Sequence, residues 1–506
     1  MAGGIALSAL LSQACSGDGA TGSTSTPPPS TSVVIGVAEG AGESDPEVGF
    51  QRIWPLFSDE GLTSLGSDGR PQPGIAESWE ASPDGLTWRF TLKPDVVFHD
   101  GTPCNATAVK AILEAALKRP DVNLYPGLLD IRGLRAEGER TLFIDLSRPS
   151  AFLLEDLYIE IVKRTQDGGT TGTGPYYVVS RSSSEATLRA HARYSQGTPE
   201  IENVVFRSYP TLRQAWASLL RGDIDAVWNL SGDALEFMTD QTVATFNFQR
   251  HLAYVMVFNS QRPQLRSAAV RRALNAAVDR QALIQSVLKG RGQPAYSPVW
   301  PNHWASDASI TGYTFDPSLA KTALDALIPP ASRKGNSRRL RFTCIVPSDY
   351  AIFERLGLLL QTQLYNVGVD LQLESVPLSQ FDARLRRGEF DAALFDLATA
   401  PSLSRVYLFW RSPGDYEGLN VFGYRNPEAD SWLDRLRFAP DVTTTRAATG
   451  QLQRVLLEDP PALFLAWSQQ SRAVSRRIDV GAAPGQDPFQ TLWKWRIERN
   501  AQVARR

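Results

Sequence analysis

The sequence is poor in the residues that build metal sites and disulfide frameworks. It holds only 3 cysteines, 4 histidines and 3 methionines among 506 residues. The histidines are His99, His191, His251 and His303. They are too scattered for the i, i+4 spacing of a metal site on one element, and no CxxC pair exists. Cys104 and Cys344 fall in different expected domains, so the sequence favours buried thiols and predicts no metal centre.

A strong net charge, long hydrophobic runs and the common catalytic motifs are missing too. The formal net charge is −2, which argues against a nucleic-acid partner, because phosphate binding needs a concentrated positive surface. No apolar stretch approaches the roughly 18 residues of a membrane span. GxSxG, HExxH, GxxxxGK[ST] and a GxGxxG in strand–helix context do not occur, so nucleophilic, zinc-hydrolytic and nucleotide chemistry lack support. We expect no cofactor and no enzymatic activity.

The first 32 residues do not belong to a folded domain. Residues 5–11 form a short apolar segment, Cys15 follows, and a Gly/Ser/Thr/Pro tract that builds no core extends to residue 32. This arrangement resembles the end of a bacterial lipoprotein signal peptide, which is cleaved before a cysteine that becomes lipidated. It departs from that pattern at Ser12, where leucine is usual. We expect Cys15 to carry a lipid anchor; the alternative is a disordered cytoplasmic tail.

The rest of the chain is long enough for about three domains, at roughly 150 residues per domain, and its 42% apolar content is ample for their cores. One stretch, 76–109, is especially informative. Residues 86–92 alternate apolar and polar, as in a strand with one buried face, between turns at 82–85 and 100–103. Apolar residues from Val109 to Leu117 then recur at helical spacing, with Asn105 or Thr107 placed as the N-cap.

A second informative feature is a short motif, the duplicated device, that occurs twice, 166 residues apart. Residues 219–226 read LLRGDIDA and residues 385–392 read LRRGEFDA. In each copy an amphipathic helix stops at a glycine, and an acidic residue precedes a short apolar run. The repeat predicts two similar α/β lobes, each with its own sheet. The alternative is that helix–Gly–strand is simply common in α/β proteins.

The stretch 76–109 resembles extracytoplasmic solute-binding proteins of the peptide, nickel and oligosaccharide type (family 5), which feed ABC importers. The words that carry the resemblance are AESWE, DGLTWRFTLK and VFHDGTP. It continues through TGTGPY at 171–176, VRRALNAAVDR at 270–280 and NVFGYRNPE at 420–428.

The resemblance implies an α/β fold of the periplasmic-binding-protein type, a type II two-lobe clamp with three domains. Lobe I would comprise residues 33–72, 165–255 and 468–506, with an inserted subdomain at 73–164. Lobe II would comprise residues 256–467. Two crossovers, near 252–259 and 462–467, would form the hinge, where a few residues absorb the backbone change of closure.

Ligands of α/β sheets bind beyond the carboxyl ends of strands, which places the duplicated strand ends at the expected cleft. The candidate ligand-binding residues are Trp228, Asn229, Asn259, Phe395, Asp396, Trp410 and Trp467. The alternative for each aromatic residue is ordinary core packing. In peptide-binding relatives an acid four positions before a proline captures the α-amino group; counting back from Pro401 gives Leu397, with Asp396 adjacent.

These expectations add up to a monomeric, lipid-anchored receptor outside the cytoplasmic membrane. It would bind an oligopeptide-like or other small-molecule ligand and deliver it to the transmembrane subunits of an ABC permease. One alternative is an oligosaccharide receptor of the same fold, suggested by the 12 tryptophans. Another class is a secreted glycoside hydrolase using the pairs Asp223/Asp225 or Glu389/Asp391. These pairs start their strands, at the end away from the expected cleft, which favours a structural role.

Overall fold

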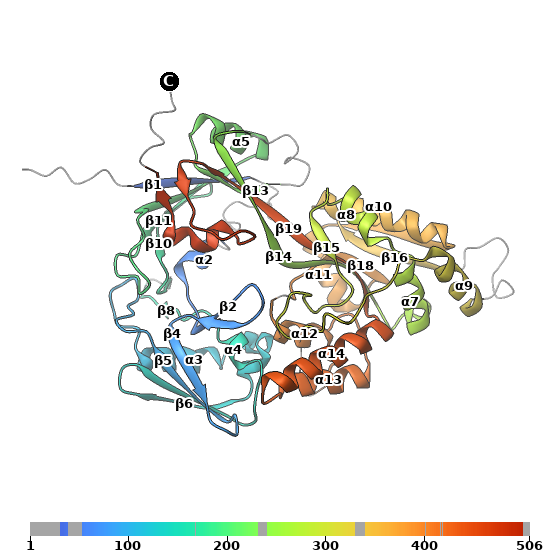
Figure 1. Ribbon diagram of the computed structural model, residues 1–506, viewed down its shortest axis with the longest axis horizontal. Helices are drawn as coiled ribbons and strands as arrows, with labels where there is room; N and C mark the ends of the chain where they lie inside the picture. Colours follow the sequence, from blue (N-terminus) through green and yellow to red (C-terminus); the bar gives the residue numbers. More distant parts are fainter. Residues whose placement is uncertain are drawn as a thin grey trace, which may run out of the picture.

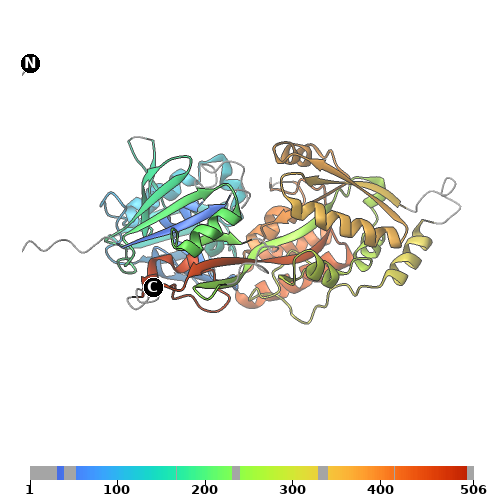
Figure 2. The same cartoon turned by 90° about the horizontal axis from the view of Figure 1, so that it is seen from above.

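The protein consists of two lobes that lie side by side and share two long strands (Figures 1 and 2). The computed structural model describes residues 31–38, 53–166, 168–230, 240–328, 340–399, 401–414, 416 and 418–498. Cys15 and its flanking tract lie outside the described residues. Within the described part of the chain, no helix is both long and apolar enough to cross a membrane.

Lobe I is built on five strands of the large sheet. In sheet order these are β10 (Tyr176–Arg181), β11 (Glu185–Ala190), β12 (Asn203–Tyr209), β1 (Ser32–Ala38) and β13 (Ala226–Leu230). The helices α2 (Pro55–Ser58), α5 (Leu212–Arg221) and η5 (Pro488–Lys494) and the strands β20 (Ile478–Asp479) and β21 (Arg496–Ile497) complete it. Its core joins the sheet to the C-terminal segment, since Val33, Phe206 and Trp495 belong to one buried cluster.

Lobe II carries β18 (Ala392–Leu397), β16 (Leu340–Pro347) and β17 (Val369–Val376), with β15 (Gly292–Pro294) at the side. Its helices are η3 (Pro263–Leu265), α7 (Ala268–Ala276), α8 (Arg280–Ser286), α9 (Pro317–Leu327), α10 (Ala351–Asn366), α11 (Leu378–Arg387), α12 (Leu403–Trp410), α13 (Pro427–Arg437) and α14 (Val442–Glu458). Two buried clusters fill the lobe.

The lobes do not have separate sheets, and that prediction was wrong. Strands β14 (Val243–Phe258) and β19 (Ala462–Ser475) cross from one lobe to the other and pair with each other antiparallel. Because β13 joins β19 and β18 joins β14, the result is one sheet of 11 strands. The crossovers near 252–259 and 462–467 therefore lie within one two-stranded ribbon (Figure 1).

The inserted subdomain has a sheet of its own, in the order β4 (Ala76–Ala81), β5 (Thr87–Leu92), β7 (Thr141–Leu146) and β6 (Ile131–Glu137). It also holds α3 (Ala106–Ala116), η1 (Pro120–Leu124), η2 (Pro126–Leu128) and α4 (Leu153–Asp156). The predicted strand–turn–helix is confirmed. Phe90 and Leu92 are buried, and Asn105 caps α3 by accepting a hydrogen bond from the Ala108 amide at 3.0 Å.

Two short pairs link this subdomain to lobe I. They are β2 (Thr63–Leu65) with β3 (Pro71–Pro73), and β8 (Lys163–Arg164) with β9 (Thr170–Thr171). The β2–β3 pair is a hairpin whose tip, residues 66–70, we call the hairpin tip.

The duplicated device has the same geometry in both lobes. Gly222 (φ 75°) and Gly388 (φ 68°) end α5 and α11 in the left-handed conformation, which a side chain disfavours. In lobe I, Asp225 accepts a hydrogen bond from the Val34 amide at 2.9 Å. In lobe II, Asp391 accepts one from the Thr343 amide at 3.0 Å. Each aspartate thus fastens its strand to the neighbouring parallel strand.

Candidate functional site

The carboxyl ends of β13 and β18 point toward each other across the middle of the shared ribbon. Leu230 on β13 pairs with Ser471, which pairs with Asn247 of β14. Leu397 on β18 pairs with Ala253 of β14. On β19 these two levels are Ser471 and Trp467, four residues apart, or about 13 Å at 3.3 Å per residue; β14 spans the same distance with six residues because it bulges there. The strand ends that carry Asn229 and Asp396 therefore approach the same stretch of the ribbon from opposite lobes, and this stretch is the floor of the candidate site. The Trp228 ring packs into the core of lobe I, 4.8 Å from the Phe489 ring and 5.9 Å from the Phe206 ring, as in the alternative interpretation of the aromatic residues.

The lobe I end of this site is held by Arg472. Its guanidinium lies 4.0 Å from the centre of the Trp228 ring and donates to the Trp228 carbonyl. It also donates to Asn229 Oδ1 at 2.7 Å and pairs with Asp487 at 2.7 Å. Gln470 donates to the same Asn229 oxygen. Burial lowers the pKa of Arg472, while its hydrogen bond to Asp487 raises it.

The lobe II end leaves a carboxylate without a partner. Phe395 is half-buried against Phe381 and Phe422, at ring distances of 5.9 and 6.0 Å. Asp396 lies beside Tyr254 in the β14–β18 ladder and makes no hydrogen bond or ion pair with another described side chain. Burial raises the pKa of Asp396, and the positive charge of Arg250 opposes that rise.

Arg250 is a candidate residue that the sequence did not reveal. It lies in a bulge of β14, where residues 250–252 face the single residue Ser468 between the pairs Gln249–Gln469 and Ala253–Trp467. Its guanidinium makes no hydrogen bond or ion pair to the described residues. Bulges redirect side chains. The only feature of the sequence that could have indicated this bulge is the run of three polar residues, Gln249-Arg250-His251, inside an otherwise largely apolar strand.

Asn259 does not lie at this site, and its predicted placement was wrong. Because β14 runs antiparallel to β18, the carboxyl end of β14 meets the amino end of β18. The Asn259 amide donates to the Asp391 carbonyl at 2.9 Å, and its side chain donates to the Phe390 carbonyl at 3.0 Å. Asp396 is five residues farther along β18, about 17 Å away.

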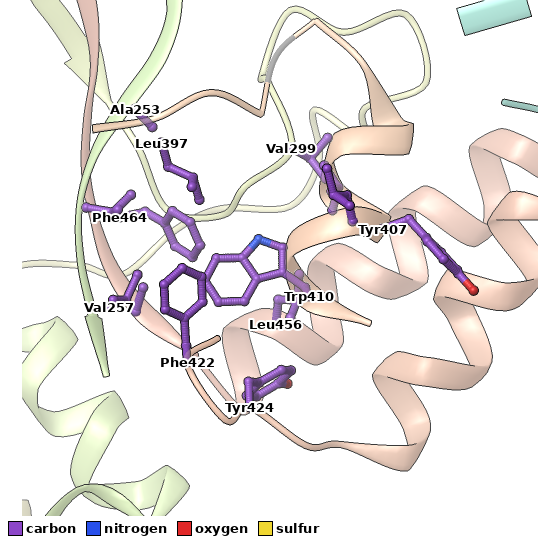
Figure 3. Packing of buried hydrophobic residues seen from close by; sticks show 14 of the residues in the cluster. Ala253, Val257, Val299, Leu397, Tyr407, Trp410, Phe422, Tyr424, Leu456 and Phe464 are labelled. Carbon is purple, nitrogen blue, oxygen red and sulfur yellow. The ribbon is translucent and has the colours of Figure 1, made fainter. Parts of the chain in front are cut away.

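Trp410 and Trp467 are core residues, as in the alternative interpretation of the aromatic side chains. Trp410 is fully buried among Phe422, Phe464 and Tyr424 of lobe II (Figure 3). Trp467 packs edge to face on Trp300 at 5.1 Å and is 1% exposed. Neither offers a face to the floor of the site.

The hairpin tip joins the two lobes. The Trp304 amide of lobe II donates to the Asp68 carbonyl at 3.0 Å, and Arg70 lies 5.5 Å from the Trp304 ring centre. At Gly69 (φ 82°) an added Cβ would lie 2.3 Å from the His303 ring and 2.4 Å from the Pro401 carbonyl oxygen. This close approach requires glycine, so the tip fits tightly against lobe II.

The inserted subdomain also contacts lobe II. Tyr416 donates to the Asn123 carbonyl at 2.8 Å, and Arg437 pairs with Asp130 at 2.8 Å with both side chains 4% exposed. Together with the hairpin tip, these contacts join the two lobes at points away from the shared ribbon.

The remaining chemical candidates have structural roles. Asp225 and Asp391 fasten strands, while Asp223 and Glu389 pair with Arg221 and Arg387. Cys104 and Cys344 are buried free thiols, as predicted, and burial raises the pKa of Cys104 to about 12. In the described ranges, no group of three or more His, Cys, Asp or Glu side chains is arranged to hold a metal ion.

A hollow of about 850 Å³ lies elsewhere, along α13 and α14, with Arg411, Trp432 and Thr444 in its lining. None of the predicted site residues lines it.

Comparison with known proteins gives concordant results. A model of the bacterial extracellular solute-binding proteins, family 5 Middle, matches residues 70–417. The probable D,D-dipeptide-binding periplasmic protein DdpA of Escherichia coli is 26% identical over 457 residues, which cover 85% of this chain and 84% of that protein. The nickel-binding periplasmic protein of the same bacterium is 26% identical over 453 residues, covering 84% and 86%.

Solved structures share the fold. The ABC transporter substrate-binding protein CtaP of Listeria monocytogenes aligns with a TM-score of 0.79 at 20% identity, covering 93% of this chain and 99% of that one. The oligopeptide-binding protein AppA of Bacillus subtilis, solved with a nonapeptide, aligns with a TM-score of 0.73 at 19% identity and the same coverage. The predicted type II periplasmic-binding-protein fold is confirmed.

Proposed function

Because this chain belongs to the bacterial extracellular solute-binding proteins of family 5, we propose that it binds an oligopeptide-like ligand between its lobes and delivers it to an ABC import permease. Proteins of this family act outside the cytoplasm and are substrate-binding receptors, so the chain is a receptor and not an enzyme. The peptide ligand, the permease contact and the lipid anchor are the proposal.

The observation that supports a peptide-like ligand is the pair of unsatisfied charges at the site. Asp396 and Arg250 are near enough to influence each other electrostatically, yet neither makes an ion pair among the described residues. A half-buried charge without a partner lowers stability, because desolvation is not compensated. A ligand with an ammonium group and a carboxylate satisfies both. Asn229 and the Phe395 ring would flank it.

Ligand between these residues also favours closure. Turning a mostly open clamp into a mostly closed one needs about 5.5 kcal/mol of differential affinity, so the ligand must contact both lobes. In this proposal Asn229 represents lobe I, Asp396 and Phe395 represent lobe II, and Arg250 belongs to the ribbon between them.

An oligosaccharide has less support from the geometry. Sugars stack on open aromatic faces, but Trp410 and Trp467 are buried and the Trp228 ring is already stacked by Arg472 at 4.0 Å. The glycoside hydrolase alternative has even less support, because the carboxylates at the starts of the two strands are hydrogen-bonded to backbone amides or paired with arginines.

The test begins with mass spectrometry of any ligand that co-purifies, followed by a thermal-shift panel of free, N-acetylated and C-amidated peptides and of oligosaccharides. Asp396→Asn is expected to weaken binding of free-amino peptides about tenfold to hundredfold, the effect of losing one charged hydrogen bond. Arg250→Gln is expected to weaken the binding of peptides with a free carboxylate and to leave the binding of C-amidated peptides unchanged. Asp382→Asn, on the exposed side of α11, is the control. Binding of oligosaccharides alone, or peptide binding unchanged in Asp396→Asn, would refute the peptide site.

The anchor is tested separately. With the gene expressed from its natural upstream region, Cys15→Ala is expected to move the protein from the membrane fraction to the soluble fraction, because two acyl chains give lasting attachment. An unchanged distribution would remove the anchor from the proposal.

A further inference from the structure

The first turn of α12 in lobe II is capped by a side chain from the inserted subdomain. Ser402 is the N-cap residue of α12, but its side chain caps no amide of its own helix. Glu155 of α4 takes this role instead. One of its carboxylate oxygens accepts from the Ser404 amide at 2.9 Å and from the Ser402 hydroxyl at 2.9 Å. The Leu403 amide also hydrogen-bonds to this carboxylate. Every hydrogen-bond partner described for the Glu155 side chain therefore belongs to lobe II.

The neighbouring carboxylate, Asp156, is anchored on both sides of the same contact. It accepts from the Ser404 hydroxyl of lobe II at 2.7 Å and from the Gly127 amide of its own subdomain at 2.6 Å. Glu155 is 3% exposed and Asp156 is 1% exposed. Two adjacent carboxyl groups thus lie buried in a contact between parts of the chain about 250 residues apart.

The charges around them do not neutralise Glu155. The ionisable groups that act on Asp156 are Arg405, Tyr416 and Arg437 from lobe II and Tyr158 from the inserted subdomain; Tyr407 and Asp130 act on Arg437 in turn. Arg437 pairs with Asp130 and Arg405 donates to Tyr158. Both arginines lower the pKa of Asp156, but the charge that acts on Glu155 is that of Asp156. Burial, with the negative charge of Asp156 added, raises the pKa of Glu155 to about 8 and outweighs the hydrogen bonds from Ser404, Ser402 and Leu403, which lower it. Burial raises the pKa of Asp156 to about 6.

We propose that the contact between Glu155 and the N-terminus of α12 is a proton-dependent latch that holds the closed clamp. The proposal rests on the proposed function, because it assumes that the inserted subdomain moves with lobe I when the clamp opens. Opening takes the Glu155 side chain into water and leaves the first amides of α12 without their acceptor.

The direction of the pH effect follows from linkage. In the open clamp the Glu155 pKa returns toward its ordinary value of 4.5, whereas in the closed clamp it is about 8. A group with the higher pKa in the closed form takes up a proton on closing. The latch is therefore complete below pH 4.5, weakens as the pH rises and is lost above about 8. Between these values the closed-to-open ratio falls by up to about tenfold per pH unit.

Small-angle X-ray scattering of the ligand-free full chain tests the latch. The radius of gyration of the wild type is expected to increase between about pH 5.5 and 8.5, the range over which the latch loses its proton. Glu155→Gln carries no proton to lose and is expected to stay compact at both ends of that range. Glu137→Gln, the same change at an exposed position of the same subdomain, is expected to follow the wild type. A constant wild-type radius, or a Glu155→Gln variant that expands like the wild type, would overturn the latch.

Hydrogen exchange of the wild type supplies a second measurement that needs no variant. After correction for intrinsic exchange, protection of the Leu403 and Ser404 amides is expected to fall across the same pH range. Constant protection would contradict the latch even if Glu155→Gln failed to fold. Because these experiments contain no ligand, a wrong ligand class leaves them unchanged. Conversely, ligand binding by a chain with no pH response would overturn the latch and leave the receptor function standing.

Discussion

The two copies of the helix–glycine–strand device are alike where they begin and different where they end. Both close a ten-residue helix with a left-handed glycine and fasten a strand with an aspartate. The lobe I strand then leads to Asn229, which is occupied by Arg472 and Gln470. The lobe II strand leads to Asp396, which has no described partner side chain.

The difference shows how one structural unit serves two purposes. The beginning of each strand determines the register of its sheet, so both copies need the same aspartate. The carboxyl ends lie at the candidate site, where lobe I satisfies its own polar groups and lobe II leaves a charge without a partner side chain among the described residues. We therefore expect the chemical specificity of the proposed site to reside mainly on the lobe II side and on Arg250.

The largest expected effect concerns the shared aspartates. The Asp225 side chain is 3% exposed and also accepts from Arg477 at 2.6 Å, whereas the Asp391 side chain, which pairs with Arg262 at 3.3 Å, is 23% exposed. Asp225→Ala is expected to cost about 2–3 kcal/mol, because it removes a buried carboxylate that accepts from both the Val34 amide and Arg477, and Asp391→Ala about 1 kcal/mol. Differential scanning calorimetry measures both. Equal costs would mean that burial does not distinguish the two copies.

Smaller changes in stability are expected at the strand ends, and their sign should differ between the two lobes. Asn229→Ala is expected to lower the stability of the ligand-free chain by about 1 kcal/mol, because Arg472 loses a buried acceptor. Asp396→Asn is expected to raise it by up to about 1 kcal/mol, because an unpaired, desolvated charge is removed. The check is urea unfolding followed by tryptophan fluorescence, without ligand. Loss of stability in Asp396→Asn would show that this carboxylate has a structural partner.

Local patterns predicted local structure well. The alternation around Phe90, the cap at Asn105 and the glycines that end α5 and α11 all appear as expected, because each depends on residues close in sequence. The merger of the two sheets did not follow from the sequence. It depends on pairing between β14 and β19, more than 200 residues apart, and residue alternation carries no information on such a partner.

The site was predicted in part for the same reason. The ends of β13 and β18 face each other as expected, but the placement of Asn259 failed because strand direction in the sheet is not visible in a single strand. From the sequence, Trp410 fits a binding surface and a hydrophobic core equally well, because its neighbours in the folded chain are unknown. Arg250 and Glu155 were missed because their significance lies in what does or does not contact them in the folded chain.

The bulge at residues 250–252 has a mechanical consequence. Ladder pairing in the ribbon is interrupted there, so we expect relative rotation of the lobes to concentrate at this point. Arg250 would then lie close to the rotation axis, whereas the contact that α4 makes through Glu155 lies away from the ribbon (Figure 1) and would move farther during opening. A ligand group bound to Arg250 in the proposed site would therefore turn nearly in place while the contact at Glu155 separates.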